Sequence, residues 1–157
     1  MRIIDCFMYF DEDLVLEIRL NTLNKIVNKF VICEATRDHA GNKKKLKFDI
    51  NKFSEFREKI NYLVVDDIPV KVKPLKKNWH ENHTRDQFQR NALEREIKNF
   101  NPEDLIMISD IDEIPNPNKI KEFNIENKYA CFLQKNFQSK MNLLNTTDKF
   151  WPGTKIC

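Results

Sequence analysis

The sequence predicts an α/β protein whose central sheet is mostly parallel and covered by helices on both faces. Two observations support this prediction. Short apolar runs rich in Ile, Val and aromatic residues alternate with stretches whose apolar residues recur at helical spacing. Such strand–helix–strand units join parallel strands through right-handed crossovers. The 157 residues suffice for one domain with a buried core, and 41% hydrophobic with 32% charged residues is typical of a globular protein.

Five segments are predicted to be strands. Leu105–Ser109 (LIMIS) is apolar up to its last residue, which predicts a central place in the sheet. The segment after the last strand, including Trp151–Gly153, is expected to be an irregular tail. The other four strands are Arg2–Phe10, Lys29–Ala35, Asn61–Ile68, which Pro69 ends, and Tyr129–Leu133, which extends toward Phe137.

Three helices are predicted between these strands. Asp11 is expected to cap a helix that runs to about Asn28. A second helix fits Asn51–Lys59, with its phenylalanines on one face. The longest helix spans about Thr84–Phe100 and ends at Asn101–Pro102, because a residue that precedes proline resists the helical conformation.

Composition excludes several classes of function. Lys and Arg number 27 against 24 Asp and Glu, and the resulting charge of +3 is too small to indicate nucleic acid or membrane binding. The basic runs Lys43–Lys47 and Lys71–Lys77 lack stacking aromatic residues and are expected to be solvated loops. Only two glycines are present, so no glycine-rich phosphate loop exists. A bound diphosphate must therefore be neutralised by a metal ion or by cationic side chains.

The cysteines and the apolar segments predict a cytoplasmic protein. The four cysteines contain no C-x-x-C pair, and Cys6, Cys33 and Cys131 lie in predicted strands, so they are expected to be buried thiols in a reducing compartment. No N-terminal signal pattern is seen, and no window reaches the roughly 18 apolar residues that a membrane span requires.

Polar side chains are predicted to gather at the edge of the sheet where the parallel strands end, which is where such sheets bind ligands. The longest helix should begin at this edge with Arg85, Gln89 and Arg90. Acids that hold a cation beside arginines that bind an anion indicate a ligand site, although loop ends are polar in any protein. The residues that follow the strands are Asp11, Asp13, Glu34, Thr36, Asp66, Asp67, Asp110 and Asp112.

The segment Leu105–Pro115 reads LIMISDIDEIP. Asp110 and Asp112 offer hard oxygen ligands directly after a buried strand, and Mg²⁺ or Mn²⁺ binds such carboxylates together with phosphate oxygens and water. That ion would neutralise a leaving diphosphate. Haloacid-dehalogenase-like phosphatases also use Asp-x-Asp, but normally after the first strand and followed by Thr or Val. Two aspartates that cap a loop are the simpler alternative.

Five segments in this order resemble glycosyltransferase family 17, the β-1,4-mannosyl-glycoprotein 4-β-N-acetylglucosaminyltransferase family. They are MRIIDCFMYFDEDLVLEIRLNTL, KFVICEAT, QRNALEREI, LIMISDIDEIP and WPGTK. The resemblance implies a GT-A-like (Rossmann-like) three-layer fold with one nucleotide-sugar-binding, catalytic domain over residues 1–157. It also implies a UDP-N-acetylglucosamine donor, a glycan acceptor, inversion at the anomeric carbon, and a divalent metal, Mn²⁺ in preference to Mg²⁺.

The resemblance also assigns residues. The family's metal motif falls on Asp110-Ile111-Asp112, its Glu-Ile-Arg on Glu17, Ile18 and Arg19, and its Gln-Arg-Asn on Gln89, Arg90 and Asn91. Independently of the resemblance, Glu113 is the candidate nearest in sequence for the base that takes the acceptor's proton, with Asp148 or a residue after Cys157 as alternatives. Arg85 or Arg90 would be the second cation at the diphosphate. The residues expected to contact the sugar donor are Phe10, Glu17, Arg19, Glu34, Asp66, Arg85, Gln89, Arg90, Asn91 and Asp110.

Two further functions remain open at this stage. The family's members are longer, so residues that shape the acceptor site are expected after Cys157, and the chain could be a truncated or non-catalytic module that binds a sugar nucleotide. A metal-dependent phosphohydrolase is the third possibility. Release of UDP from a UDP-sugar would identify the transferase, and release of phosphate from simple esters would identify the phosphohydrolase.

Overall fold

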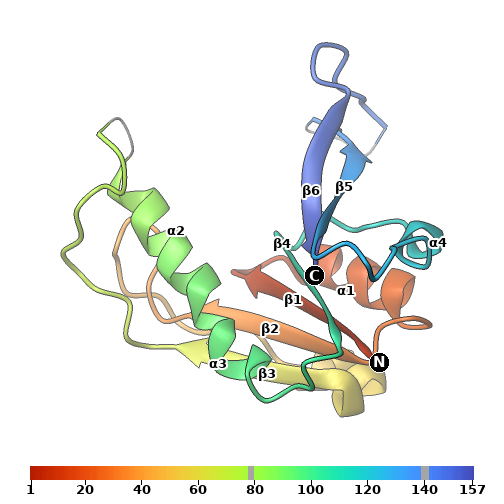
Figure 1. The fold of residues 1–157 in the computed structure, drawn as a ribbon. Helices are drawn as coiled ribbons and strands as arrows, with labels where there is room; N and C mark the ends of the chain where they lie inside the picture. Colours follow the sequence, from red (N-terminus) through yellow and green to blue (C-terminus); the bar gives the residue numbers. More distant parts are fainter. Residues whose placement is uncertain (78–79, 139–141) are drawn as a thin grey trace.

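The computed structural model describes residues 1–77, 80–138 and 142–157. In these ranges six strands form one sheet in the order β3-β2-β1-β4-β6-β5 (Figure 1). The first four in this order are parallel, and β6 pairs antiparallel with both β4 and β5. The strands are β1 (Ile3–Tyr9), β2 (Lys29–Ala35), β3 (Ile60–Val65), β4 (Leu105–Ser109), β5 (Ala130–Lys135) and β6 (Phe150–Ile156).

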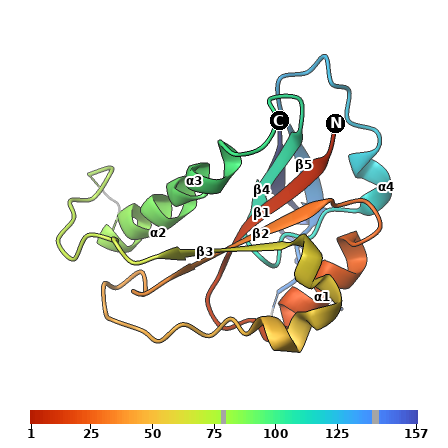
Figure 2. The same ribbon diagram turned by 90° about the horizontal axis from the view of Figure 1, so that it is seen from below.

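Helices cover both faces of the sheet, which confirms the three predicted layers (Figures 1 and 2). Neighbouring residues of β2 serve opposite layers, because side chains alternate along a strand. Phe30 packs with the core that includes α1, whereas Val31 packs with the core that includes α2. Within the described residues, no helix is long and apolar enough to cross a membrane. The helical segments are α1 (Asp13–Leu23), the 3₁₀ segment η1 (Ile50–Lys59), α2 (Glu81–Ala92), α3 (Glu94–Ile97) and α4 (Pro117–Ile120).

The first helix is shorter than predicted at both ends. Its N-cap residue is Glu12, not Asp11, and the Glu12 carboxylate accepts a hydrogen bond from the N–H of Asp11 (3.0 Å). The helix ends at Leu23, before the expected Asn28. Asn28 exchanges hydrogen bonds with Ile3 at the start of β1, so the chain must leave the helix before it can align β2 with β1.

The other two predicted helices also differ in detail. The segment predicted as a helix over Asn51–Lys59 is a 3₁₀ segment with a kink at Phe53, and this kink lets both phenylalanines reach the core. The long helix begins at Glu81 and is divided at Leu93 into α2 and α3. The N–H of Leu93 bonds the carbonyl three residues back (3.2 Å), which tightens the turn there.

The largest departure from the prediction is the C-terminal segment, which is a strand and not an irregular tail. β6 lies between β4 and β5, and Ile106 and Cys157 exchange backbone hydrogen bonds of 2.8 and 3.0 Å. The sequence does not predict β6 as a strand because Pro152 and Gly153 are both disfavoured in sheets. Only β6 runs against the other strands, so the sheet is mostly parallel, as predicted.

The cysteines are free thiols, but only two are buried. Cys6 and Cys33 lie in the inner strands, and burial raises the pKa of both thiols, that of Cys33 to about 12. The apolar neighbours of Cys131 predict a buried thiol, but Cys131 is exposed, because β5 is the last strand of the sheet.

We expect acid to weaken the contact between β1 and the turn before β4. The Asp104 carboxylate is buried and bonded to the guanidinium of Arg2, which lowers its pKa from 3.8 to about 2. Because the folded pKa is depressed, the stability from this contact is complete above pH 3.8 and is lost as the pH falls toward 2. Urea unfolding of Asp104→Asn should show a shallower fall in stability below about pH 5 than the unmodified protein. Equal slopes would contradict the assignment.

Candidate functional site

The turn that carries the Asp-x-Asp motif is held from beneath by Arg19. The side chains of Arg19 and Asp5 are both fully buried and form an ion pair, with Nε–Oδ2 and Nη2–Oδ1 distances of 2.8 and 2.7 Å. A buried guanidinium must have all of its donors bonded to offset the loss of water. Its remaining contacts are to Ser109 Oγ (2.6 Å) and to the carbonyls of Asp110 (3.0 Å), Ile111 (3.0 Å) and Glu113 (3.2 Å). Arg19 therefore positions the turn, in place of the contact with a sugar donor expected from the sequence.

Glu113 closes the same turn and connects it to β6. One carboxylate oxygen accepts the N–H of Asp110 (3.1 Å), and the other accepts the indole N–H of Trp151 (2.6 Å). The Glu113 carbonyl also accepts a hydrogen bond from the Thr154 hydroxyl (2.6 Å). β6, the strand that was not predicted from the sequence, thus supplies two of the contacts that hold Glu113, the candidate base.

Asp110 and Asp112 fit the coordination of a divalent ion. Both are exposed. Asp110 Oδ1 accepts a hydrogen bond from Arg90 (2.7 Å), while its Oδ2 and the Asp112 carboxylate have no hydrogen-bond partner in the part of the chain that the structure describes. Mg²⁺ and ions like it are held by one or two carboxylates, with phosphate oxygens and water as the other ligands. In the described ranges no group of three or more Asp, Glu, His or Cys side chains could hold a metal ion. An ion at Asp110 and Asp112 would therefore take its other ligands from water or from the phosphates of a bound molecule.

Arg90 is the cation beside these aspartates. It lies on α2, and its guanidinium contacts Asp110 and, at 3.6 Å, Asp86. About a quarter of its side chain is exposed, so it can reach both the aspartate and a ligand. Of the two arginines considered from the sequence, the structure brings Arg90 to the motif.

Arg85 serves the neighbouring loops instead. Its side chain is only 4% exposed and donates to the carbonyls of His39 (3.1 Å) and Val70 (2.7 Å). Gly41 adopts a φ of 94°, and a Cβ there would lie 3.1 Å from the guanidinium, so glycine permits the close approach. Gln89 is likewise buried and donates to the Cys33 carbonyl (3.0 Å). Both residues occupy the inward face of α2, as predicted, but they bind the protein itself.

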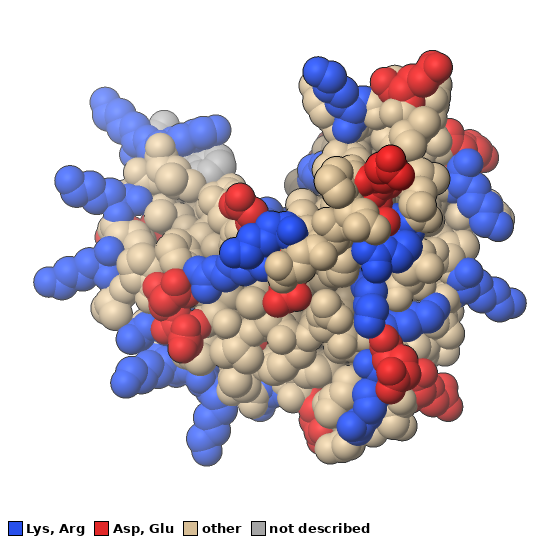
Figure 3. All heavy atoms as spheres, turned by 60° about the horizontal axis from the view of Figure 1, so that its bottom comes forward, with Lys and Arg blue, Asp and Glu red and all other residues tan. Residues whose placement is uncertain are grey.

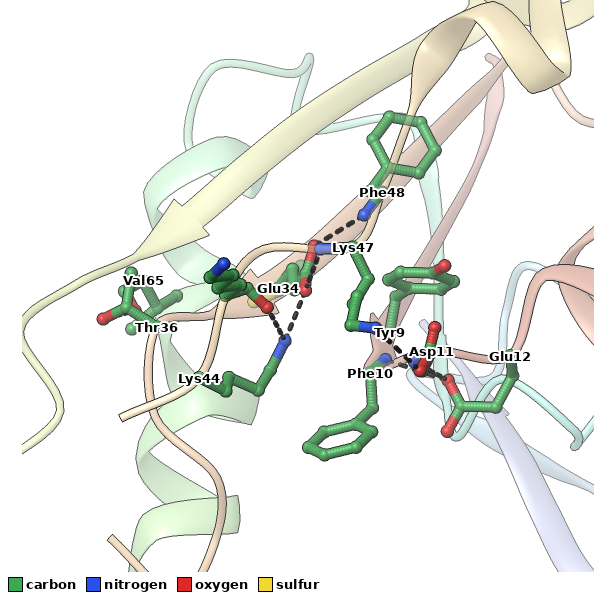
Figure 4. Close-up of polar contacts among 12 residues, drawn as sticks. Tyr9, Phe10, Asp11, Glu12, Glu34, Thr36, Lys44, Lys47, Phe48 and Val65 are labelled. Atoms are coloured by element: carbon green, nitrogen blue, oxygen red, sulfur yellow. Dashed lines mark hydrogen bonds and ion pairs between the residues drawn. The ribbon is translucent and has the colours of Figure 1, made fainter. Parts of the chain in front are cut away.

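Glu34 is also occupied by the protein (Figure 4). Its fully buried carboxylate accepts hydrogen bonds from the Lys44 ammonium, from the N–H groups of Lys47 (2.8 Å) and Phe48 (3.0 Å), and from the Tyr62 hydroxyl (2.8 Å). Burial and this bond to Glu34 raise the pKa of Tyr62. Glu34 therefore fixes the segment from residue 44 to 48 across the ends of β1 and β2.

The remaining predicted contacts lie on the surface. Phe10 is half exposed, with the Lys44 ammonium 4.9 Å from its ring centre. Asp66 is exposed, and its carboxylate makes no hydrogen bond within the described chain. Glu17 and Asn91 are exposed on α1 and α2, and within the described ranges their hydrogen bonds stay inside their own helices. The first two remain available to a ligand at the strand ends, and the last two are not brought to the motif.

One chain of contacts crosses the molecule at this edge. It runs from Arg90 on α2 through Asp110 and Glu113 to Trp151 on β6. α2 and the β5–β6 hairpin stand apart on either side of it (Figure 1), and Figure 3 shows the surface notched between two lobes. Trp151 was not foreseen from the sequence. Asp5 carried a usable signal, since a charge inside an apolar strand needs a buried partner.

Comparisons with known proteins agree on one family. The model of "Glycosyltransferase family 17" matches residues 1–143. The human and rat β-1,4-mannosyl-glycoprotein 4-β-N-acetylglucosaminyltransferases are each 28% identical to this chain over 119 residues, and the mouse protein is 27% identical. The match covers 73% of this chain but only 22% of each relative. No solved structure matches the chain.

We expect Asp5→Asn to be strongly destabilising. The substitution leaves the buried charge of Arg19 unpaired, which typically costs about 3–5 kcal/mol. The matched control is Asp67→Asn, which removes an exposed ion pair with Arg95 and should cost less than about 1 kcal/mol. Urea unfolding measures both changes. Similar losses in the two variants would show that the Asp5–Arg19 pair does not hold the core as described.

Proposed function

The chain belongs to glycosyltransferase family 17, and from this premise we propose that it transfers N-acetylglucosamine, or a related sugar, from a UDP-sugar to a glycan with inversion at the anomeric carbon. The names of its relatives support N-acetylglucosamine as the sugar. The observation that carries the proposal is the exposed pair Asp110 and Asp112, held by buried Arg19 at the end of β4 and next to Arg90.

Asp110 and Asp112 would hold a divalent metal, Mn²⁺ in preference to Mg²⁺, and when bound it would neutralise charge that develops on the leaving diphosphate. Arg90 adds a second positive charge from α2. In the structure this guanidinium is bonded to Asp110, so its positive charge already lies where a phosphate would bind. A cation aimed at developing charge in a preorganised site needs little rearrangement during the reaction.

Glu113 is the proposed general base. An ionised carboxylate can accept about four hydrogen bonds. The N–H of Asp110 and the indole of Trp151 use one position on each oxygen of Glu113, which leaves room for an acceptor hydroxyl. These two contacts also fix the direction of the carboxylate, and orientation is what a base needs before its proton affinity matters. Among the described residues, the hydrogen bond of Asp148, the alternative, is a local one from its N–H to Asn145 Oδ1.

The nucleoside would lie across the ends of β1 to β3. Phe10 offers an exposed ring and Asp66 an exposed carboxylate at these ends. Glu34 contributes indirectly, because it holds residues 44–48 beside Phe10 (Figure 4). Of the residues expected to touch the sugar donor, Phe10, Asp66, Arg90 and Asp110 keep that role in this proposal, whereas buried Arg19, Glu34, Arg85 and Gln89 shape the site.

We expect UDP-N-acetylglucosamine to stabilise the protein only when Mn²⁺ is present. At about one hundred times its Kd, a ligand that binds only the folded state adds about 2.7 kcal/mol, which corresponds to roughly 5–10 °C for a chain of this size. Asp112→Asn should abolish the shift in a thermal melt, whereas Glu122→Gln, an exposed carboxylate on another segment, should keep it. A full shift in Asp112→Asn, or a shift without metal, would remove the metal from the proposal.

Glu113→Gln should separate chemistry from binding. The amide keeps the shape of the side chain but cannot take a proton, so the rate of UDP release should fall by about 10²–10⁴. The thermal shift with Mn²⁺ and UDP-N-acetylglucosamine should be unchanged, because Glu113 is not a proposed metal ligand. Release of UDP at the normal rate would exclude Glu113 as the base. Phosphate release from simple esters, with none of UDP, would instead indicate the phosphohydrolase.

A further inference from the structure

A β-bulge turns Trp151 toward the turn after β4. The register between β5 and β6 shifts between Cys131 and Leu133, where β6 holds one more residue than β5. An extra residue interrupts the alternation of side chains, so residues on both sides of the bulge can face the same way. Trp151 and Thr154 accordingly both bond Glu113, one to its carboxylate and one to its carbonyl.

The indole N–H of Trp151 forms a hydrogen bond, whereas much of the side chain is exposed. Tryptophan has one hydrogen-bond donor, and here it bonds Glu113 at 2.6 Å. The residue is nevertheless 52% exposed, a large apolar surface at the margin of a polar site. Tryptophan in such a position offers one apolar surface and one polar tip. A pyranose ring has a matching form, with C–H bonds on its face and hydroxyls around its edge.

The position of Trp151 relative to the aspartates identifies which sugar it would meet. Asp110 lies between Arg90 and Glu113, and Trp151 contacts Glu113 from the β6 side. The diphosphate of the sugar donor is proposed to bind at the end of this series that carries Asp110 and Arg90. An inverting attack approaches from the side opposite the leaving group. The sugar at the Trp151 end is therefore the one that attacks.

We propose that Trp151 is the platform for the acceptor saccharide: its ring stacks on a pyranose face while its N–H aims Glu113 at the attacking hydroxyl. This inference rests on the proposed function. In the step it serves, the hydroxyl proton passes to Glu113 and the hydroxyl oxygen bonds the anomeric carbon. The bond from that carbon to the diphosphate oxygen breaks, and UDP leaves with the electron pair.

Two substitutions separate the ring from the N–H. Trp151→Gln keeps a donor for Glu113 and removes the ring, whereas Trp151→Phe keeps a ring and removes the donor. Phe150→Ala is the matched control, because Phe150 is the adjacent exposed aromatic residue. Neighbouring residues of a strand face opposite sides of the sheet, so this substitution should leave the Trp151 side unchanged. The probes are UDP-N-acetylglucosamine with Mn²⁺ and the methyl pyranosides of glucose, galactose, mannose and N-acetylglucosamine.

The two variants should change different kinetic constants for the methyl pyranoside that accelerates UDP release. Trp151→Gln should raise the KM for that acceptor about two- to tenfold and leave the KM for the sugar donor unchanged. Trp151→Phe should keep the acceptor KM and lower kcat by about tenfold or more. Phe150→Ala should change neither constant. Equal changes in both Trp151 variants, or a raised KM for the sugar donor in Trp151→Gln, would overturn the proposal.

Fluorescence tests the platform without catalysis. The chain has two tryptophans, so Trp79→Phe leaves Trp151 as the only indole. Saturable quenching by a methyl pyranoside supports the platform even if no UDP is ever released, and in that case only the proposed function fails. Metal-dependent binding of UDP-N-acetylglucosamine without quenching by any pyranoside overturns the platform and leaves the proposed function intact. Binding of neither overturns both.

Discussion

A buried guanidinium determines where the exposed aspartates lie. Arg19 can remain charged in the core only because Asp5 neutralises it and the carbonyls of the turn after β4 accept hydrogen bonds from its remaining N–H groups. Asp5 belongs to β1, Arg19 to α1 and the carbonyls to the chain after β4. These three segments must therefore pack together before the backbone conformation of the turn is fixed. The rigidity that the proposed metal site would require is thus supplied by the core and not by the exposed residues themselves.

The inner parallel strands β1, β2 and β4 could be predicted from the sequence because they are mostly buried on both faces. Lys29–Ala35 and Leu105–Ser109 are strands with the predicted first and last residues. A continuous apolar run bounded by polar residues indicates both that a segment is a buried strand and where it begins and ends. β6 carries no such signal. It is paired on both sides only because the chain returns between β4 and β5, and that long-range pairing overrides the local preference of Pro152 and Gly153.

The candidate site could be predicted in position but not in the direction of its side chains. Spacing places Glu34 and Arg85 at the correct edge of the sheet, yet both point inward and bind loops. The sequence assigns a residue to an element, whereas the partners that satisfy a buried charge come from elsewhere in the chain. Asp110 and Asp112 lie on an exposed turn after β4, as the sequence predicts, although Arg90 bonds Asp110 there. Their role as metal ligands stays a prediction.

The insertion of β6 has a consequence for the newly made chain. Until residues 150–156 have been synthesised, β4 has β1 on one side and nothing on the other, and its apolar sequence forms an open edge. Such an edge can pair with another chain, so it is a hazard during synthesis and refolding. The same late segment brings Trp151 and Thr154 to Glu113. Pairing of β6 with β4 therefore covers this edge and brings two contacts to Glu113 in the same step.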